Sequence, residues 1–227
     1  MVKRVALKCV KWAVGLALTV SFVLSPMGAA ASQRWYGVAA WYNATTNLGS
    51  STDMLVVSGT CADWNINWGF VASVLWQGTN NDTGLNYRVE EGYTYGWQGQ
   101  NILTFYWADN RPNGGGYHEH PITDITPSQY STYNMEIFWY HTNWLVTINS
   151  VDEGNSTNNP AYGKALETGT ESTSSQSVLN SAESNNLAYD KSGSGWISGW
   201  GGATQLISNA PAYAYWNIAD VNLIDGI

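Results

Sequence analysis

Short hydrophobic segments separated by turn-forming residues constrain the fold of this 227-residue chain more than any other feature. No stretch longer than about ten residues shows the 3.6-residue period of an amphipathic helix. Runs rich in β-branched and aromatic residues recur instead between clusters of Gly, Asn, Asp, Ser and Pro. The pattern predicts strands near 35–42, 53–58, 69–76, 86–95, 101–107, 116–122, 132–140, 144–149, 163–171 and 213–224.

The predicted strand 132–140 shows how such segments would pack. Its hydrophobic face would carry every second residue, namely Tyr133, Met135, Ile137 and Trp139. One buried face per strand and the absence of a long helix predict an all-β fold, an antiparallel two-sheet, jelly-roll-like (concanavalin-like) sandwich. Turns are expected at 80–84, 109–116 and 152–155. The Ser/Thr-rich stretch 170–185 is expected to be a surface loop with a helical turn near 177–183.

The first 31 residues have the layout of a secretory signal peptide. Four basic residues precede an apolar run from Trp12 to Leu24, and small residues from Gly28 to Ala31 follow. The run is shorter than the ~20 residues that a membrane-spanning helix needs. We therefore expect cleavage near Ala29–Ala31, secretion, no membrane association after signal removal, and one domain at 32–227.

Charge narrows the choice of partners. Without residues 1–31 the chain keeps five basic and seventeen acidic residues, a formal net charge of −12. Proteins bind nucleic acids and anionic lipids largely through Lys and Arg. We therefore expect no nucleic-acid partner. We also expect a monomer, whose partner would be a peptide substrate or an extracellular polysaccharide.

Cysteine and histidine offer little chemistry. Cys61 would be the only cysteine of the mature chain, so no intrachain disulfide can form, and we interpret it as a buried thiol. His118 and His120 would share one strand face, and a third ligand such as His141 would complete a metal site. Since nothing in the sequence fixes that third ligand, we predict no metal and no cofactor.

Aromatic residues are unusually frequent, with 13 Trp, 14 Tyr and 4 Phe. Most would fill the core, and others would line a groove and stack on sugar rings or grip an extended peptide. The segments 97–100 (WQGQ) and 195–200 (GWISGW) are the candidates for exposed aromatics.

Two glutamates within predicted strands lie close to glycine, Glu90 in YRVEEGYTYG and Glu171 in ALETGTES. A glycine there allows another backbone or a substrate to approach closely. Two carboxyl groups on one sheet could act as general base on a water molecule and as general acid toward a leaving amine. The alternative is a pair of solvated surface acids that lie far apart.

The run VEEGYTYGWQGQNILTFYWADNRPNGGGYHEH (89–120), the strand pair in 130–150 and TGTES (168–172) resemble the neprosin-type glutamic peptidases. This resemblance implies an eqolisin-like sandwich that hydrolyses peptides at acidic pH. It places the catalytic glutamates at Glu90 and Glu171. We expect Tyr93, Trp107 and Tyr117 to form walls of the substrate groove.

The chain also departs from that family. GGGYHEH replaces a cysteine-containing segment, and T-G-T-E lacks the family's tryptophan. Glu91 competes with Glu90, because neighbouring strand residues face opposite sides of a sheet. Two functions therefore stay open: an acid peptidase with a carboxylate dyad, or a non-catalytic module that binds carbohydrate or a cell surface through exposed tryptophans.

Overall fold

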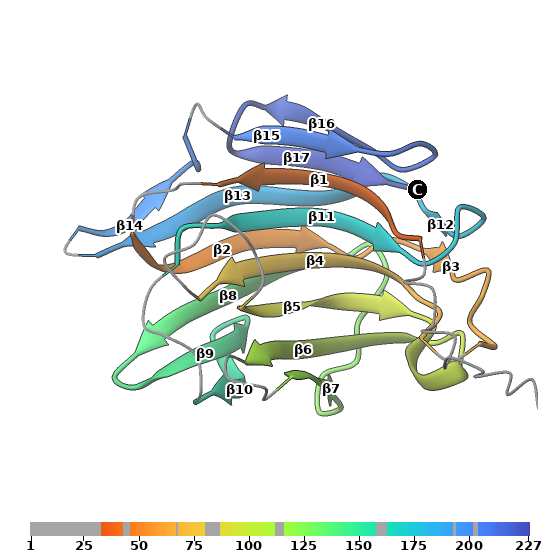
Figure 1. Cartoon of the computed structure of the whole chain (residues 1–227), viewed down its shortest axis with the longest axis horizontal. Helices are drawn as coiled ribbons and strands as arrows, with labels where there is room; N and C mark the ends of the chain where they lie inside the picture. Colours follow the sequence, from red (N-terminus) through yellow and green to blue (C-terminus); the bar gives the residue numbers. More distant parts are fainter. Residues whose placement is uncertain are drawn as a thin grey trace, which may run out of the picture. The chain divides into compact units, whose positions relative to one another are not determined.

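Two stacked antiparallel sheets form the protein, in a computed structural model that describes residues 33–42, 46–66, 68–79, 87–111, 116–157, 163–192, 194–201 and 204–227 (Figure 1). Sheet A has the order β15, β1, β11, β4, β5, β6, β7. These strands span Gln205–Ser208, Trp35–Trp41, Leu166–Ser172, Val71–Gly78, Arg88–Tyr95, Leu103–Arg111 and Gly116–Ile122.

Sheet B has the order β10, β9, β8, β2, β13, β17, β16, and β14 pairs with β13. These strands span Val151–Ser156, Asn143–Ile148, Thr132–Tyr140, Asn47–Leu55, Ala182–Lys191, Asn222–Gly226, Tyr213–Ile218 and Gly195–Ser198. The short strands β3 (Gly59–Thr60) and β12 (Val178–Leu179) pair with each other, and η1 (Trp97–Gly99) is a 3-10 turn. The predicted all-β sandwich is confirmed.

The main core lies between the two sheets and contains the largest fully buried side chains, among them Trp144, Trp200 and Phe105. A second apolar cluster belongs to sheet A alone. It consists of Val38, Ala72, Val74, Trp76, Tyr106 and Ala108. On β4 the even-numbered residues belong to this second cluster, whereas Val71 and Leu75 belong to the main core. Sheet A therefore has an inner face toward sheet B and an outer face with its own apolar floor.

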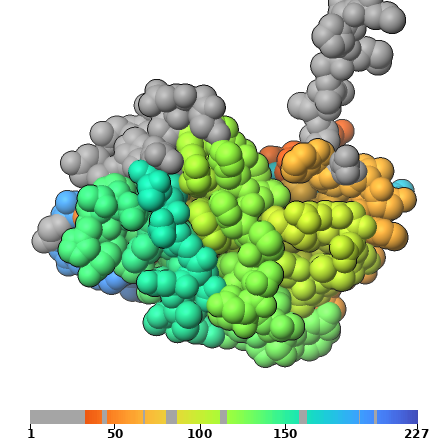
Figure 2. Space-filling model, turned by 90° about the horizontal axis from the view of Figure 1, so that it is seen from below, coloured from red at the N-terminus to blue at the C-terminus, as the bar shows by residue number. Residues whose placement is uncertain are grey.

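The edge strand β10 of sheet B lies beside β6, the strand next to the edge of sheet A, and Figure 2 shows a teal segment against a yellow-green one there. The Ser156 hydroxyl donates to the buried Asp109 carboxylate at 2.5 Å. Arg111 pairs with the same carboxylate at 2.8 Å. These contacts close that side of the sandwich and leave the outer face of sheet A free to carry a site.

Several sequence predictions match closely, and others are wrong. The observed bounds of β7 and β8 are the predicted 116–122 and 132–140, and Met135 and Ile137 are buried as the alternation requires. The turn expected at 152–155 is part of β10, because the chain reverses earlier, at Asn149 and Ser150, which both have positive φ. The single strand expected over 213–224 is the hairpin of β16 and β17.

The stretch 170–185 is not one loop with a helical turn. It contains the end of β11, all of β12 and the start of β13. β13 lies inside sheet B, between β2 and β17. The predicted signal peptide (1–31) and the turn predicted at 80–84 lie outside the described residues. Within the described ranges, no helix is long and apolar enough to cross a membrane.

Candidate functional site

Alternation along β5 decides which glutamate can face a substrate. Val89, Tyr93 and Tyr95 belong to the main core, so the odd-numbered residues point inward. Glu90 and Thr94 therefore point to the outer face of sheet A, and both line the pocket there. The sequence left Glu90 and Glu91 in competition, and the register of β5 turns Glu90 outward.

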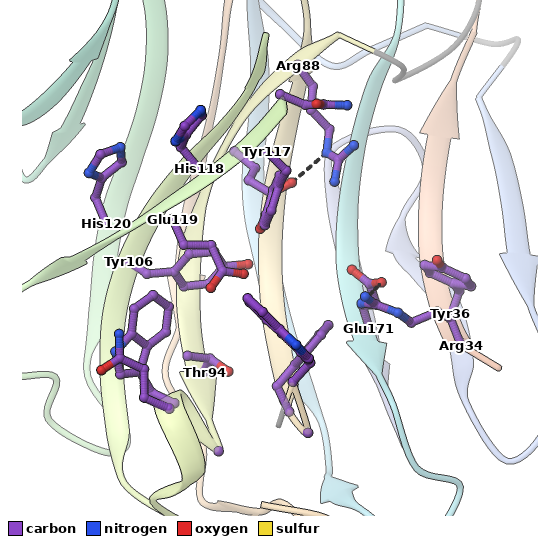
Figure 3. Close-up of a pocket in the computed structure, with 18 residues that line it drawn as sticks. Arg34, Tyr36, Arg88, Thr94, Tyr106, Tyr117, His118, Glu119, His120 and Glu171 are labelled. Atoms are coloured by element: carbon purple, nitrogen blue, oxygen red, sulfur yellow. Dashed lines mark hydrogen bonds and ion pairs between the residues drawn. The ribbon is translucent and has the colours of Figure 1, made fainter. Parts of the chain in front are cut away.

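The pocket on the outer face has a volume of about 830 Å³. Both predicted catalytic residues, Glu90 and Glu171, contribute to its wall. Figure 3 shows Arg34, Tyr36 and Glu171 on one side of the pocket, and Tyr117 and Glu119 on the other. Strands across sheet A, from β1 to the edge strand β7, thus contribute polar groups to a single concave surface.

Glu90 is held on both carboxylate oxygens. Arg88 Nε donates to Oε2 at 2.6 Å, and the Tyr117 hydroxyl donates to Oε1 at 2.6 Å. The Arg88 guanidinium also lies over the Tyr117 ring, 5.4 Å from its centroid. Only 4% of the Glu90 side chain is exposed. Two donors and a fixed orientation suit an ionised carboxylate that accepts a proton from a water molecule.

Glu171 has a different environment. Arg34 donates to its Oε1 at 2.6 Å, and 14% of the side chain is exposed. Burial raises the pKa of this carboxyl group, Arg34 opposes that effect, and the charge of Glu90 adds to it. Burial and the neighbouring Glu171 raise the pKa of Tyr36 to about 12, so its hydroxyl stays protonated. Glu171 therefore holds its proton more readily than a free glutamate, as does Glu119 of the same pocket, whose pKa is raised by burial.

A third carboxyl group, Glu167, lies in a smaller adjoining pocket of about 370 Å³ whose lining also includes Arg88 and Glu171. Tyr42 donates a hydrogen bond to Glu167. Burial raises the Glu167 pKa to about 7, although the Tyr42 hydrogen bond and Arg88 oppose this rise. Near neutral pH this group is therefore divided between its acid and base forms.

The sheet register fixes how these three carboxyl groups are arranged. Trp76 of β4 pairs with Glu90 on one side and with Glu167 on the other, so Glu90 and Glu167 lie in one cross-strand row, about 10 Å apart at Cα. Glu171 pairs with Ala72, four positions further along, which puts its Cα about 16 Å from that of Glu90. Glu171 thus shares a pocket with Glu90, whereas Glu167 shares a row with it.

Of the three predicted groove walls, one lies in the pocket. Tyr117 lines it and contacts Glu90. Tyr93 and Trp107 belong to the main core, so their prediction as walls is wrong. The Tyr93 hydroxyl bonds to the backbone of Leu55, and the Trp107 ring stacks on His120 with centroids 4.1 Å apart. Both residues have the opposite parity to the outward residues of their strands.

Of the aromatic residues predicted to be exposed, some are accessible and one is buried. Trp97 is half-buried and lines the pocket, and Trp196 is 45% exposed. Trp200 is fully buried, so its prediction as an exposed residue is wrong. Its indole N–H donates to the Ala188 carbonyl at 3.2 Å, and this bond satisfies its polar atom inside the core.

His118 and His120 line the pocket, but the described residues support neither a metal site nor a reactive thiol. Among them, no three His, Cys, Asp or Glu side chains gather closely enough to hold a metal ion. His141 lies in the exposed turn between β8 and β9, whereas His118 and His120 are on β7 of the other sheet. Cys61 is buried, as predicted, and burial raises its pKa to about 12. A thiol in that state is a poor nucleophile.

Sequence reasoning missed several polar residues of this surface, among them Arg34, Tyr36, Arg88, Glu119 and Glu167. Strand parity could have indicated three of these. Arg88 is two residues before Glu90, Glu119 is two residues after Tyr117, and Glu167 is four residues before Glu171, so each shares a face with a predicted residue. Tyr36 on β1, and Arg34 just before that strand, depend on the pairing of β1 with β11, which leaves no mark in the sequence.

The described fold is that of known glutamic peptidases. A structure of scytalido-glutamic peptidase with a transition state analog inhibitor matches 85% of this chain and 97% of its own, with a TM-score of 0.58 and 11% identity. SCP-B, a member of the eqolisin family of peptidases in a complex with the tripeptide Ala-Ile-His, matches 85% of this chain and 96% of its own, with a TM-score of 0.51 and 11% identity.

Sequence comparison adds nothing to this likeness. No protein-family model matches the chain, and no curated protein matches it. At 11% identity the structural likeness concerns the fold alone. The chain therefore has the β-sandwich seen in eqolisin-type glutamic peptidases, and its outer face carries a pocket with acidic, basic and aromatic side chains.

Proposed function

We propose that the chain is a secreted peptidase that hydrolyses peptide bonds with a pair of carboxyl groups at acidic pH. The observation that carries this proposal is the common pocket of Glu90 and Glu171, on one face of one sheet, with different partners for each. The likeness to glutamic peptidases supports the same function, as do the residues that resemble neprosin-type enzymes.

In this mechanism Glu90 is the general base. Held by Arg88 and Tyr117, it accepts a proton from a water molecule whose oxygen attacks the carbonyl carbon of the scissile bond. A protonated carboxyl group of β11 then donates its proton to the leaving amine as the C–N bond breaks. Environments that make one carboxyl group ionise more readily than its partner are the usual way to divide these two roles.

Two residues of β11 carry a carboxyl group, and substituting each in turn shows which of them is the general acid. Glu171 shares the pocket with Glu90, and Glu167 shares its cross-strand row. The purified protein should digest casein near pH 3–4, a range set by the protonated form that the acid needs. Glu90→Gln and one of Glu167→Gln or Glu171→Gln should abolish digestion, whereas Asp53→Asn on sheet B should keep it. Full activity in all three Gln variants would overturn the proposal.

The pH profile gives an independent measurement. The general acid must be protonated, and burial raises the pKa of both Glu171 and Glu167, the latter to about 7. Activity should therefore fall as the pH rises through that raised pKa, and should be low above about pH 8. Activity that increases between pH 7 and pH 9 would contradict the assignment.

Secretion belongs to the same proposal. The mature chain would begin after residue 31 and act as a monomer outside the cell, without a metal or cofactor. N-terminal sequencing of protein recovered from culture medium should give a start near residue 32, and sedimentation should give the monomer mass. Activity should survive treatment with EDTA.

A second candidate function is a non-catalytic module for extracellular polysaccharide or a cell surface. Its support is the exposure of Trp64, Trp68 and Trp196, at 41%, 76% and 45%. Exposed indoles stack readily on sugar rings. Retention on insoluble polysaccharide together with inactivity on casein from pH 3 to pH 8 would favour this module over the peptidase.

A further inference from the structure

One end of the large pocket is lined by aromatic rings. We call the residues Trp68, Phe70, Trp97 and Tyr106 the aromatic lip; all four line the pocket. The rings of Trp97 and Tyr106 lie 6.0 Å apart at a tilt of 35°. The proposed acid–base chemistry assigns no task to these rings, although they occupy the same cavity as Glu90.

Trp68 has an unfavourable position in two respects. It is 76% exposed, the most exposed of the large hydrophobic residues in the described ranges. Its φ of 72° places a bulky side chain on left-handed backbone, which non-glycine residues seldom adopt. Such strain concentrates at binding and catalytic sites. Since neither burial nor backbone preference favours this arrangement, a role in binding accounts for it best.

The lip is fixed in place by the loops beneath it. A Cβ added to Gly96 would lie 2.4 Å from the Gly69 carbonyl oxygen and 2.7 Å from Cys61 Sγ, so the loops after β3 and β5 pack in direct contact. The Phe70 N–H donates to Thr173 Oγ1 at 2.8 Å. A surface that is already ordered loses little conformational entropy when a ligand binds. The backbone that carries Trp68, Phe70 and Trp97 is therefore packed before any partner binds.

The lip also has a direct connection to the carboxyl groups. The Arg34 guanidinium lies over the Phe70 ring, 4.6 Å from its centroid, and the same group pairs with Glu171 at 2.6 Å. Along β5 Glu90 is about 7 Å from Gly92, which pairs with Tyr106 of the lip, and about 13 Å from Thr94, which precedes Trp97 by three residues. The lip therefore spans about two to four residues of an extended peptide from Glu90. A peptide that is cleaved at Glu90 can therefore reach the lip.

We propose that the aromatic lip is a specificity subsite that binds one aromatic side chain of the peptide substrate, about two to four residues from the cleaved bond. This inference rests on the proposed function. Phenylalanine, tyrosine or tryptophan would make face and edge contacts with the four rings, which aromatic pairs favour beyond simple burial. Sugar rings also stack on exposed indoles, so a carbohydrate ligand is a separate outcome of the test.

The test measures binding and needs no turnover. The full mature chain with Glu90→Gln is titrated with ten-residue Gly/Ala/Ser peptides in which one Phe is moved along the sequence, and affinity is measured by calorimetry. We expect Phe at one position to bind about tenfold more tightly than Ala at that position. Added Trp68→Ala or Trp97→Ala should remove this preference, and the control Tyr215→Ala, an exposed aromatic residue in β16, should keep it.

The outcomes separate this inference from the proposed function. The subsite assignment is overturned if Phe shows no positional preference, or if the preference survives both lip substitutions. This holds even if the wild-type protein cleaves casein. A preference that is lost in both lip variants would support the lip as a binding site for an aromatic side chain, even if the wild-type protein proves inactive. Binding to cellulose or chitin that depends on Trp68, without affinity for any peptide, would overturn the peptide subsite in favour of carbohydrate. Circular dichroism confirms that each variant is folded.

Discussion

Glu90 and Glu91 are neighbours on β5 and have opposite environments. Glu90 accepts hydrogen bonds on both oxygens, from Arg88 and Tyr117, at the wall of a solvent-filled pocket. Glu91 is fully buried on the inner face, and both of its oxygens lack a hydrogen-bond partner among the described residues. Burial, with smaller contributions from Glu136 and Glu153, raises the Glu91 pKa well above its usual value.

The difference separates a carboxyl group with a chemical role from one that the fold merely tolerates. An isolated buried charge is costly, so Glu91 remains neutral over a wide pH range. Glu90 has the donors that a carboxylate needs and access to a substrate. Four predictions examine this contrast between the outer and inner faces of sheet A.

The largest effect should come from Glu90→Gln. Loss of a general base lowers kcat by about 10²–10⁴-fold. Glu91→Gln keeps the shape and neutrality of the buried group, so it should leave kcat within about threefold of wild type at acidic pH, far from the loss expected of a base. Casein hydrolysis by the two purified variants provides the measurement. Equal losses of kcat in the two variants would contradict the assignment of a catalytic role to Glu90 alone.

The inner face should make the protein sensitive to alkali. Burial raises the pKa of Glu91, and it raises that of Asp225 to about 8. Because the folded-state pKa lies above the unfolded one, the stabilisation is complete below about pH 4 and declines as the pH rises toward the folded value. Tm should fall on the order of 10 °C between pH 4 and pH 9. Glu91→Gln should reduce that fall, and a Tm that rises with pH would refute this reading.

Tyrosines on the two faces offer a matched pair of smaller effects. Tyr117→Phe removes a donor to Glu90 and should lower kcat about tenfold with little change in Tm. Tyr93→Phe removes the hydroxyl that donates to the Leu55 carbonyl and accepts from Val57 N–H. It should cost about 1–3 kcal/mol of unfolding free energy and leave kcat unchanged. Urea denaturation and kinetics on both variants would show whether the effects separate as expected.

The smallest effect concerns Cys61. Its thiol is buried, and its pKa of about 12 keeps it protonated at neutral pH. A thiol reagent such as DTNB should therefore react with the folded protein very slowly and with the urea-unfolded protein at once. Rapid labelling of the folded state would show that this loop, which supports Trp68, is open to solvent.

The sequence predicted the fold well wherever alternation was regular. Residues 132–140 form β8 with the expected buried face. β13 was missed because a register shift between Asn185 and Ala188 interrupts its alternation, and Asn186 has a φ of 55°. Its Ser and Asn residues also resemble those of a loop. Local composition could not reveal that this strand pairs with three others in sheet B.

The candidate site was predictable in part. Glu90, Glu171 and Tyr117 were identified and line one pocket, whereas Tyr93 and Trp107 were placed on the wrong face. Parity along β5 excludes any arrangement in which Glu90 and Tyr93 share a face. Residues such as Arg34 and Tyr36 required the register between strands that are distant in sequence, and a single sequence carries no record of that register.

Alternation along β5 has a consequence for how such a protein can diverge. The outward positions can change their chemistry while the inward positions continue to specify the same sandwich, so activity and architecture are inherited through separate sets of residues. Gly92 is an exception among the outward positions, because a Cβ there would lie 2.1 Å from the Ser73 carbonyl oxygen. A directed-evolution library at Arg88, Glu90 and Thr94 would therefore explore new reactions on an unchanged scaffold.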